Sequence, residues 1–250
     1  MSFFRSLFQK KPDLPVLDRM EAGVLDDTVP LATLLRQVVV LGGRTASEPL
    51  RTWATNELQG YTTPDVELPD YRLLPALIQM DCWAPGQRVT DMTISVLDLP
   101  EFARDRVKQE VPMADGVGKI EAVLARAEPG KSVKLSMPGG PELARMMTFE
   151  RQANGVHVER VYWTVHPSDL HDVLDQVRNR LAQFVSELRA TMPAGAPDPT
   201  PDQVQQVVQH VITIKTGKHS EVTVNAPVAQ AGPNSTATST IEEPTPEQRD

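Results

Sequence analysis

One long amphipathic segment constrains the fold most strongly, the stretch HPSDLHDVLDQVRNRLAQFVSELRATMP that begins at His166. Pro167 and Ser168 are typical of a helix start, and Asp169 and Asp172 place negative charge where the helix dipole favours it. The apolar side chains recur at helical spacing: Leu170, Val173, Leu174, Val177, Leu181, Phe184, Val185 and Leu188. A single stripe of this length predicts a long helix that packs on a sheet.

The preceding chain predicts that sheet and further helices. Apolar spacing after Thr28, a good N-cap, indicates one helix, and a second begins at Ser47 and ends at Gly60. Further on, extended and helical patterns alternate without strict order. We expect strands at 72–80, 88–97, 132–137 and 155–165, with helices near 100–109, 115–128 and 140–148. The predicted fold class is α+β: an N-terminal helical part followed by a mixed sheet with a long packing helix, then a C-terminal β-hairpin appendage.

Composition divides the chain into five segments. Residues 1–15 form an amphipathic extension rich in phenylalanine, residues 16–191 the main domain and residues 192–202 a proline-rich linker. Residues 203–230 are expected to form a β-hairpin, and the acidic residues 231–250 are expected to be disordered.

The expected hairpin carries alternating apolar residues, Ile212 and Ile214 before Gly217, and Val222 and Val224 after it. An isolated two-stranded hairpin is only marginally stable in water, so this apolar face needs another surface. Identical copies of the chain can supply it, and the pattern therefore predicts homo-oligomerisation through the C-terminal strands. The alternative is that the hairpin adds to a sheet edge of its own chain.

Charge and composition exclude several classes of partner. A net charge of −8 opposes nucleic-acid binding. No apolar run approaches the length of a membrane span and no signal-peptide pattern is present, so we expect a cytoplasmic protein. The N-terminal Phe-rich segment could lie on a membrane, but its two turns favour packing on protein. Cys82 has no second thiol for a disulfide or a zinc site, and we expect it to pack in the core.

Motifs that resemble catalytic or metal sites fail on their context. The stretch ARAEPGKS places Lys131 and Ser132 as in a phosphate-binding loop, but a helical pattern precedes it and a strand pattern follows, the reverse of what such a loop needs. His166 and His171 lie at a helix start without the spacing of metal ligands. We therefore assign no catalytic residue, no metal and no cofactor, and a non-enzymatic protein is favoured.

The stretch WATNELQGY and the turn that follows it supply the candidate site. Trp53, Glu57 and Tyr61 share the end of one predicted helix, and Asp70, Tyr71 and Arg72 follow in the returning chain. Hydrogen bonds or an ion pair among these side chains would brace the fold. The alternative is a ligand pocket lined by Trp53, Glu57, Tyr61 and Arg72, because pockets combine aromatic walls with a few charges.

A family resemblance covers most of residues 16–190. The stretches LDDTVPLATLLRQVVVLGGRTASEPLRTWATNELQGY, ELPDYRLLPA, VPMADGVGKIEAVL and VRNRLAQFVSEL resemble the AbiTii domain of bacterial abortive-infection proteins. The resemblance implies a role in anti-phage defence and supplies no active site. We therefore expect a non-enzymatic, oligomerising sensor or adaptor that binds a further defence-system protein. The alternative is an effector or nucleotide-sensing domain that uses the pocket.

Overall fold

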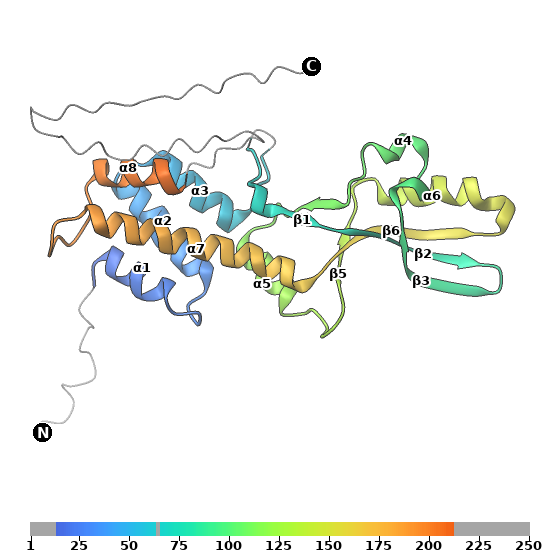
Figure 1. The fold of residues 1–250 in the computed structure, drawn as a ribbon, viewed down its shortest axis with the longest axis horizontal. Coiled ribbons are helices and arrows are strands. Elements are labelled where there is room, and N and C mark those ends of the chain that lie inside the picture. Colours follow the sequence, from blue (N-terminus) through green and yellow to red (C-terminus); the bar gives the residue numbers. More distant parts are fainter. Residues whose placement is uncertain (1–13, 64–65, 213–250) are drawn as a thin grey trace, which may run out of the picture. The chain divides into compact units, whose positions relative to one another are not determined.

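The computed structural model describes residues 14–63 and 66–212 (Figure 1). Helices α1 (Val16–Val24), α2 (Leu31–Arg44) and α3 (Glu48–Gln59) form the expected N-terminal helical part. The start of α2 differs from the prediction. Pro30 is its N-cap, whereas the Thr28 hydroxyl donates to Asp26 Oδ1 at 2.6 Å in the preceding turn. Gly60 ends α3 as predicted, at a φ of 100° that glycine adopts without strain.

The strands form two sheets. Strands β1 (Leu73–Pro75) and β4 (Glu110–Pro112) make a pair, and β2 (Leu77–Ala84), β3 (Gln87–Ile94), β5 (Val133–Ser136) and β6 (His157–Val165) make a four-stranded sheet in the order β3-β2-β6-β5. The α+β class is confirmed. Every ladder between these strands is antiparallel, so the sheet is not mixed.

Short helical segments connect the strands. They are η1 (Asp70–Arg72), η2 (Val96–Asp98), α4 (Glu101–Arg104), α5 (Val117–Leu124), α6 (Gly140–Arg151) and η3 (Gln152–Asn154). Helix α6 packs along β6, and its Thr148 hydroxyl accepts the Val158 N–H at 2.9 Å. Strand β5 ends at Ser136, opposite Tyr162, and does not extend along β6 as far as Val158. The Thr148 hydroxyl therefore accepts the Val158 N–H in place of a neighbouring strand.

The long helix α7 (Pro167–Thr191) confirms the predicted helix, but most of it packs on helices α1, α5 and α8 (Pro201–Val211) and not on the sheet. His166 caps it, because its Nδ1 accepts the Ser168 N–H while Asp169 accepts the His166 N–H. Its apolar stripe belongs to two cores. Leu170 and Val173 are buried with the four-stranded sheet, and the stripe from Val177 onward is buried with the helices.

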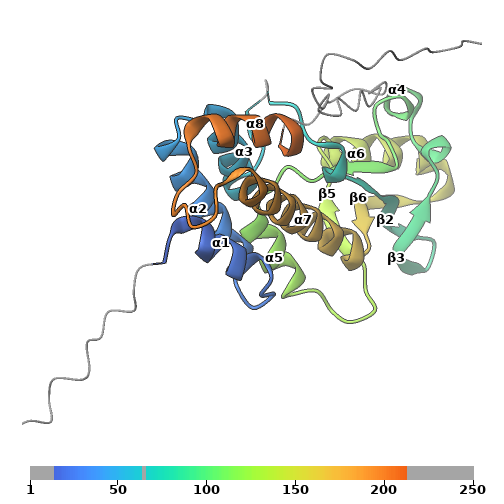
Figure 2. The same ribbon diagram turned by 60° about the vertical axis from the view of Figure 1, so that its left-hand side comes forward.

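The chain after α7 corrects one predicted boundary. Residues 203–212 begin the expected hairpin, but the structure places a helix, α8 (Pro201–Val211), there. Ile212 ends this helix instead of opening a strand. It is buried in the helical core together with the valines of α8, which are Val204, Val207, Val208 and Val211. Both views show α8 beside α3 and α7 (Figures 1 and 2). Ile214, Val222 and Val224, the extension 1–13 and the tail 231–250 lie outside the described residues.

Among residues 14–63 and 66–212, no helix has both the length and the apolar character that crossing a membrane requires.

Candidate functional site

Glu57 is the centre of the candidate site that the sequence predicted. This α3 residue has no exposed surface, and it accepts three side-chain hydrogen bonds. Its Oε1 accepts from the Tyr61 and Tyr71 hydroxyls, each at 2.6 Å, and its Oε2 accepts from Arg72 Nη2 at 2.5 Å. A buried carboxylate is tolerated when it is paired and hydrogen-bonded, and these contacts supply both conditions. We call Glu57, Tyr61, Tyr71 and Arg72 the Glu57 cluster.

Arg72 connects the cluster to the chain that leaves β4. Its side chain is also fully buried, and its Nη1 donates to the carbonyl oxygens of Met113 at 2.9 Å and Asp115 at 2.7 Å. The guanidinium carbon also lies 5.0 Å from the centre of the Tyr61 ring. Arg72 therefore links α3 to the segment after β4 through its side-chain contacts.

Backbone contacts beside the cluster are equally close. Gly60 forms an isolated bridge with Asp115, and a Cβ on Gly116 would lie 2.2 Å from the Leu58 carbonyl oxygen. No side chain fits at this distance, so glycine is required at position 116 for the two chain segments to meet.

The phenols of the cluster remain protonated. Burial, followed by the nearby Glu57 charge, raises the pKa of Tyr61 well above its ordinary value and that of Tyr71 to about 12. Both hydroxyls therefore stay donors to Glu57 over the physiological pH range. Asp70 does not join them, because it begins η1 with its side chain exposed.

An apolar groove of about 380 Å³ lies above the cluster. Its apolar lining is Pro49, Trp53, Tyr61, Val66, Pro69 and Ile212. Glu57 and Arg72 do not line it, because both side chains lie beneath the surface. The aromatic half of the predicted pocket is therefore accessible, and the charged half is buried. We call this feature the α3 groove.

A second cluster, which the sequence did not predict, lies on the four-stranded sheet. Asp81 of β2 is paired with Arg160 of β6, and Lys134 of β5 with Asp91 of β3. The Tyr162 hydroxyl lies between the two carboxylates, 2.7 Å from Asp81 Oδ1 and 2.9 Å from Asp91 Oδ1. We call these five residues the sheet cluster.

The sheet register explains this arrangement. Met80 and Ile78 pair with Val161 and Trp163 on the core face, so their neighbours face the other way. The register shifts opposite Asp81 and Cys82, because β6 carries one extra residue between Arg160 and Val158. Cys82 is buried in the core as predicted.

Asp81 remains ionised although it is buried. Burial acts to raise its pKa, but hydrogen bonds from the Asp91 N–H, the Tyr162 hydroxyl and Arg160 outweigh this effect and lower the pKa to about 2. Asp91 has a φ of 57°, which is rare for a residue other than glycine, and its N–H donates to Asp81 at 3.0 Å. The strained backbone at Asp91 thus aims a donor at the buried carboxylate.

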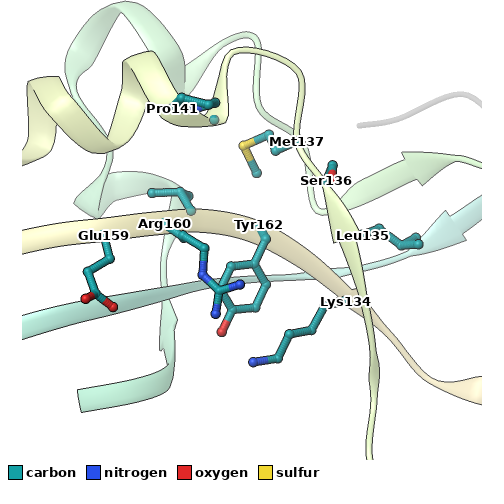
Figure 3. A pocket seen from close by; sticks show the side chains of 10 residues that line it. Lys134, Leu135, Ser136, Met137, Pro141, Glu159, Arg160 and Tyr162 are labelled. Atoms are coloured by element: carbon teal, nitrogen blue, oxygen red, sulfur yellow. The ribbon is translucent and has the colours of Figure 1, made fainter. Parts of the chain in front are cut away.

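A cavity of about 380 Å³ opens beside the sheet cluster, between β5, β6 and the start of α6 (Figure 3). Lys134, Arg160 and Tyr162 line one side of it, and Met137 and Pro141 line another. The Lys134 ammonium and the Arg160 guanidinium lie 4.8 and 5.6 Å from the centre of the Tyr162 ring. Each cation also has a carboxylate partner, so the charges of the cluster balance internally.

The structure places the two motifs that resemble a phosphate-binding loop and a metal site at the ends of elements. Lys131 is exposed in the turn between α5 and β5 and pairs with Glu128 at 2.6 Å. A helix therefore precedes this turn and a strand follows it, so no helix N-terminus meets a phosphate there. His166 caps α7, and the described part of the chain holds no group of three or more histidine, cysteine or acidic side chains placed to bind a metal.

Comparison with known proteins places this α+β domain in a family. The AbiTii family model matches residues 16–214, which is most of the chain, and the chain therefore belongs to the AbiTii family. AbiTii is a family of abortive-infection, anti-phage defence domains. No curated protein and no solved structure matches the chain. The matched region contains the Glu57 cluster, the α3 groove and the sheet cluster.

Proposed function

We propose that the protein acts in abortive-infection defence as a non-enzymatic, oligomerising sensor or adaptor. One observation carries this proposal: Glu57 and Arg72 are completely enclosed and paired with each other. Reacting groups must meet a substrate, whereas an enclosed ion pair acts on the fold around it. The residues that sequence analysis selected are thus suited to stabilising a binding domain.

The rival function is an effector or nucleotide-sensing domain. The α3 groove favours it, since Trp53 and Tyr61 offer aromatic walls to a ligand. The two functions differ in what Glu57 and Arg72 do. In the adaptor they stabilise the domain, and in the rival they would contact the ligand after a conformational change.

A paired substitution separates the two functions. We expect Glu57→Ala with Arg72→Ala to lower the free energy of unfolding, and to weaken phage protection only as far as the amount of folded protein falls. The measurements are urea unfolding and plaque counts at matched levels of folded protein. Glu142→Ala with Arg145→Ala is the matched control, because it removes an exposed ion pair on helix α6 that lies outside the α3 groove. Full stability with lost protection would contradict the adaptor proposal and favour the rival.

Assembly is the second part of the proposal. We expect copies of the chain to join through the segment that carries Val222 and Val224. We also expect the assembly to bind a second defence-system protein in the cytoplasm. A version that ends at Thr216 tests this, because it keeps α8 and its core contacts. Light scattering should show more copies per particle for the full chain than for the shortened one. Equal numbers of copies per particle would refute assembly through this segment.

A further inference from the structure

The α3 groove has an unpartnered apolar lining, and the described chain ends inside it. Ile212, the C-cap of α8, is one of the lining residues and is itself buried. Two residues of chain span at most about 7 Å, so the residue at position 214 cannot leave the neighbourhood of the groove. That residue is Ile214. We propose that the α3 groove is the docking site of the chain's own segment 213–216, with the Ile214 side chain as the apolar anchor.

The chemistry of the groove fits this segment. Its walls are aromatic and aliphatic, from Trp53, Tyr61 and Pro69, and burial of an isoleucine side chain against such walls is favourable. Two carboxylates also line the groove: Glu67, and Glu48, which is paired with Arg51 at 2.5 Å.

The sequence places a cation next to the anchor. Lys215 directly follows Ile214. When the Ile214 side chain enters the groove, the Lys215 ammonium can therefore pair with an acidic side chain at the edge of the groove. The segment thus matches the groove in both polarity and charge.

The tether favours the chain's own segment over that of a second copy. A segment joined directly to Ile212 is present at a high effective concentration that does not depend on the amount of protein. A second copy would have to displace it. Docking of this segment does not depend on whether the residues after it assemble.

Trypsin cleavage of the full chain tests the docking. Lys215 lies beside the anchor and Lys218 lies beyond the docked segment, so the two sites report on each other within one molecule. We expect cleavage after Lys215 to be at least about tenfold slower than after Lys218, from the free energy of burying one isoleucine side chain. Ile214→Ser should bring the two rates together, and Val222→Ser, the matched control, should leave the Lys215 site protected. Equal rates in the unaltered chain would overturn the proposal.

A disulfide distinguishes the possible occupants. In a full chain with Glu67→Cys and Lys215→Cys, mild oxidation should give a crosslink within one chain at any protein concentration, while the buried Cys82 stays reduced. Covalent dimers in place of this product would assign the groove to a second copy and overturn docking within the chain. If no crosslink forms, and trypsin cleaves the unaltered chain equally fast after Lys215 and Lys218, then neither the chain's own segment nor that of a second copy occupies the groove.

Discussion

The Glu57 cluster and the sheet cluster contain the same kinds of side chain in opposite surroundings. In each, an arginine pairs with a carboxylate that also accepts a tyrosine hydroxyl. The Glu57–Arg72 side chains are 0% exposed, whereas Arg160 is 61% exposed above a buried Asp81. Removing one member of an enclosed pair leaves the other charge buried without a partner and destabilises the fold strongly. Removing one member of an exposed pair costs little, because water then solvates the remaining charge. Exposure of the cation therefore decides whether removing it destabilises the fold or is compensated by water.

Removal of Arg72 should produce the largest effect. We expect Arg72→Ala to lower the free energy of unfolding by about 3–5 kcal/mol, because it leaves Glu57 buried without its cation. Urea unfolding followed by circular dichroism measures the loss. Combining it with Glu57→Gln should cost less than the sum of the single changes. A loss below about 1 kcal/mol, the range of exposed pairs, would remove the contrast between the two clusters.

Neutralising Asp81 should have an intermediate effect. Asp81→Asn keeps the volume but weakens the hydrogen bonds from Tyr162, Arg160 and the Asp91 N–H, and we expect a loss of about 1–3 kcal/mol. Arg160→Ala is the comparison, with less than about 1 kcal/mol expected because its side chain is largely exposed. If Arg160→Ala cost as much as Arg72→Ala, exposure of the cation would not be the deciding variable.

Acid should weaken the sheet cluster in a defined pH window. The Asp81 pKa falls from 3.8 to about 2 on folding, so its contribution is complete above pH 3.8 and is lost as the pH falls toward 2. We expect Asp81→Asn to lack this part of the acid dependence of the urea midpoint. Parallel pH curves for the two proteins, offset by a constant, would show that Asp81 does not titrate in this window.

Removal of the exposed pair Lys131–Glu128 should have the smallest effect on stability, because both of its side chains face solvent. The side chains are 71% and 68% exposed, so Lys131→Ala should leave the free energy of unfolding nearly unchanged. Phage protection should be unchanged in the same variant. Loss of ATP binding in Lys131→Ala, in an assay where the unaltered chain binds ATP, would revive the phosphate-loop interpretation.

Local patterns predicted much of the fold. The stripe of α7, the end of α3 at Gly60 and strands β3, β5 and β6 were readable because each depends on residues near in sequence. The predicted strand 72–80 instead divides into β1 and β2, which lie in different sheets, and β4 was not predicted. Trp53, Glu57, Tyr61, Tyr71 and Arg72 are also close in sequence: they lie on α3, directly after it, and on η1. Asp70, predicted to brace the chain with them, is exposed at the start of η1.

Helix α8 was missed although its signal is present. Thr200 and Gln203 form a capping box, and four valines follow at helical spacing. The prolines before it indicated a linker, and β-branched residues favoured a strand, but packing against α7 outweighs that preference.

The sheet cluster could not be predicted in the same way. Its residues come from four strands, and the partners of Asp81 are ten to 81 positions away. Only the sheet register, with its shift opposite Asp81, brings Asp91, Arg160 and Tyr162 to that carboxylate. Long-range pairing of this kind leaves no local pattern.

The sharing of α7 between two cores limits how the protein can be divided. Leu170 and Val173 complete the core of the sheet, and Phe184 and Leu188 complete that of the helices. A fragment that stops before α7 would expose both apolar surfaces, and one that begins after α1 would uncover the helical core at Leu17. The shortest autonomous piece therefore extends from about the first described helix to the last. The sheet and the helical layer therefore cannot be exchanged as separate modules.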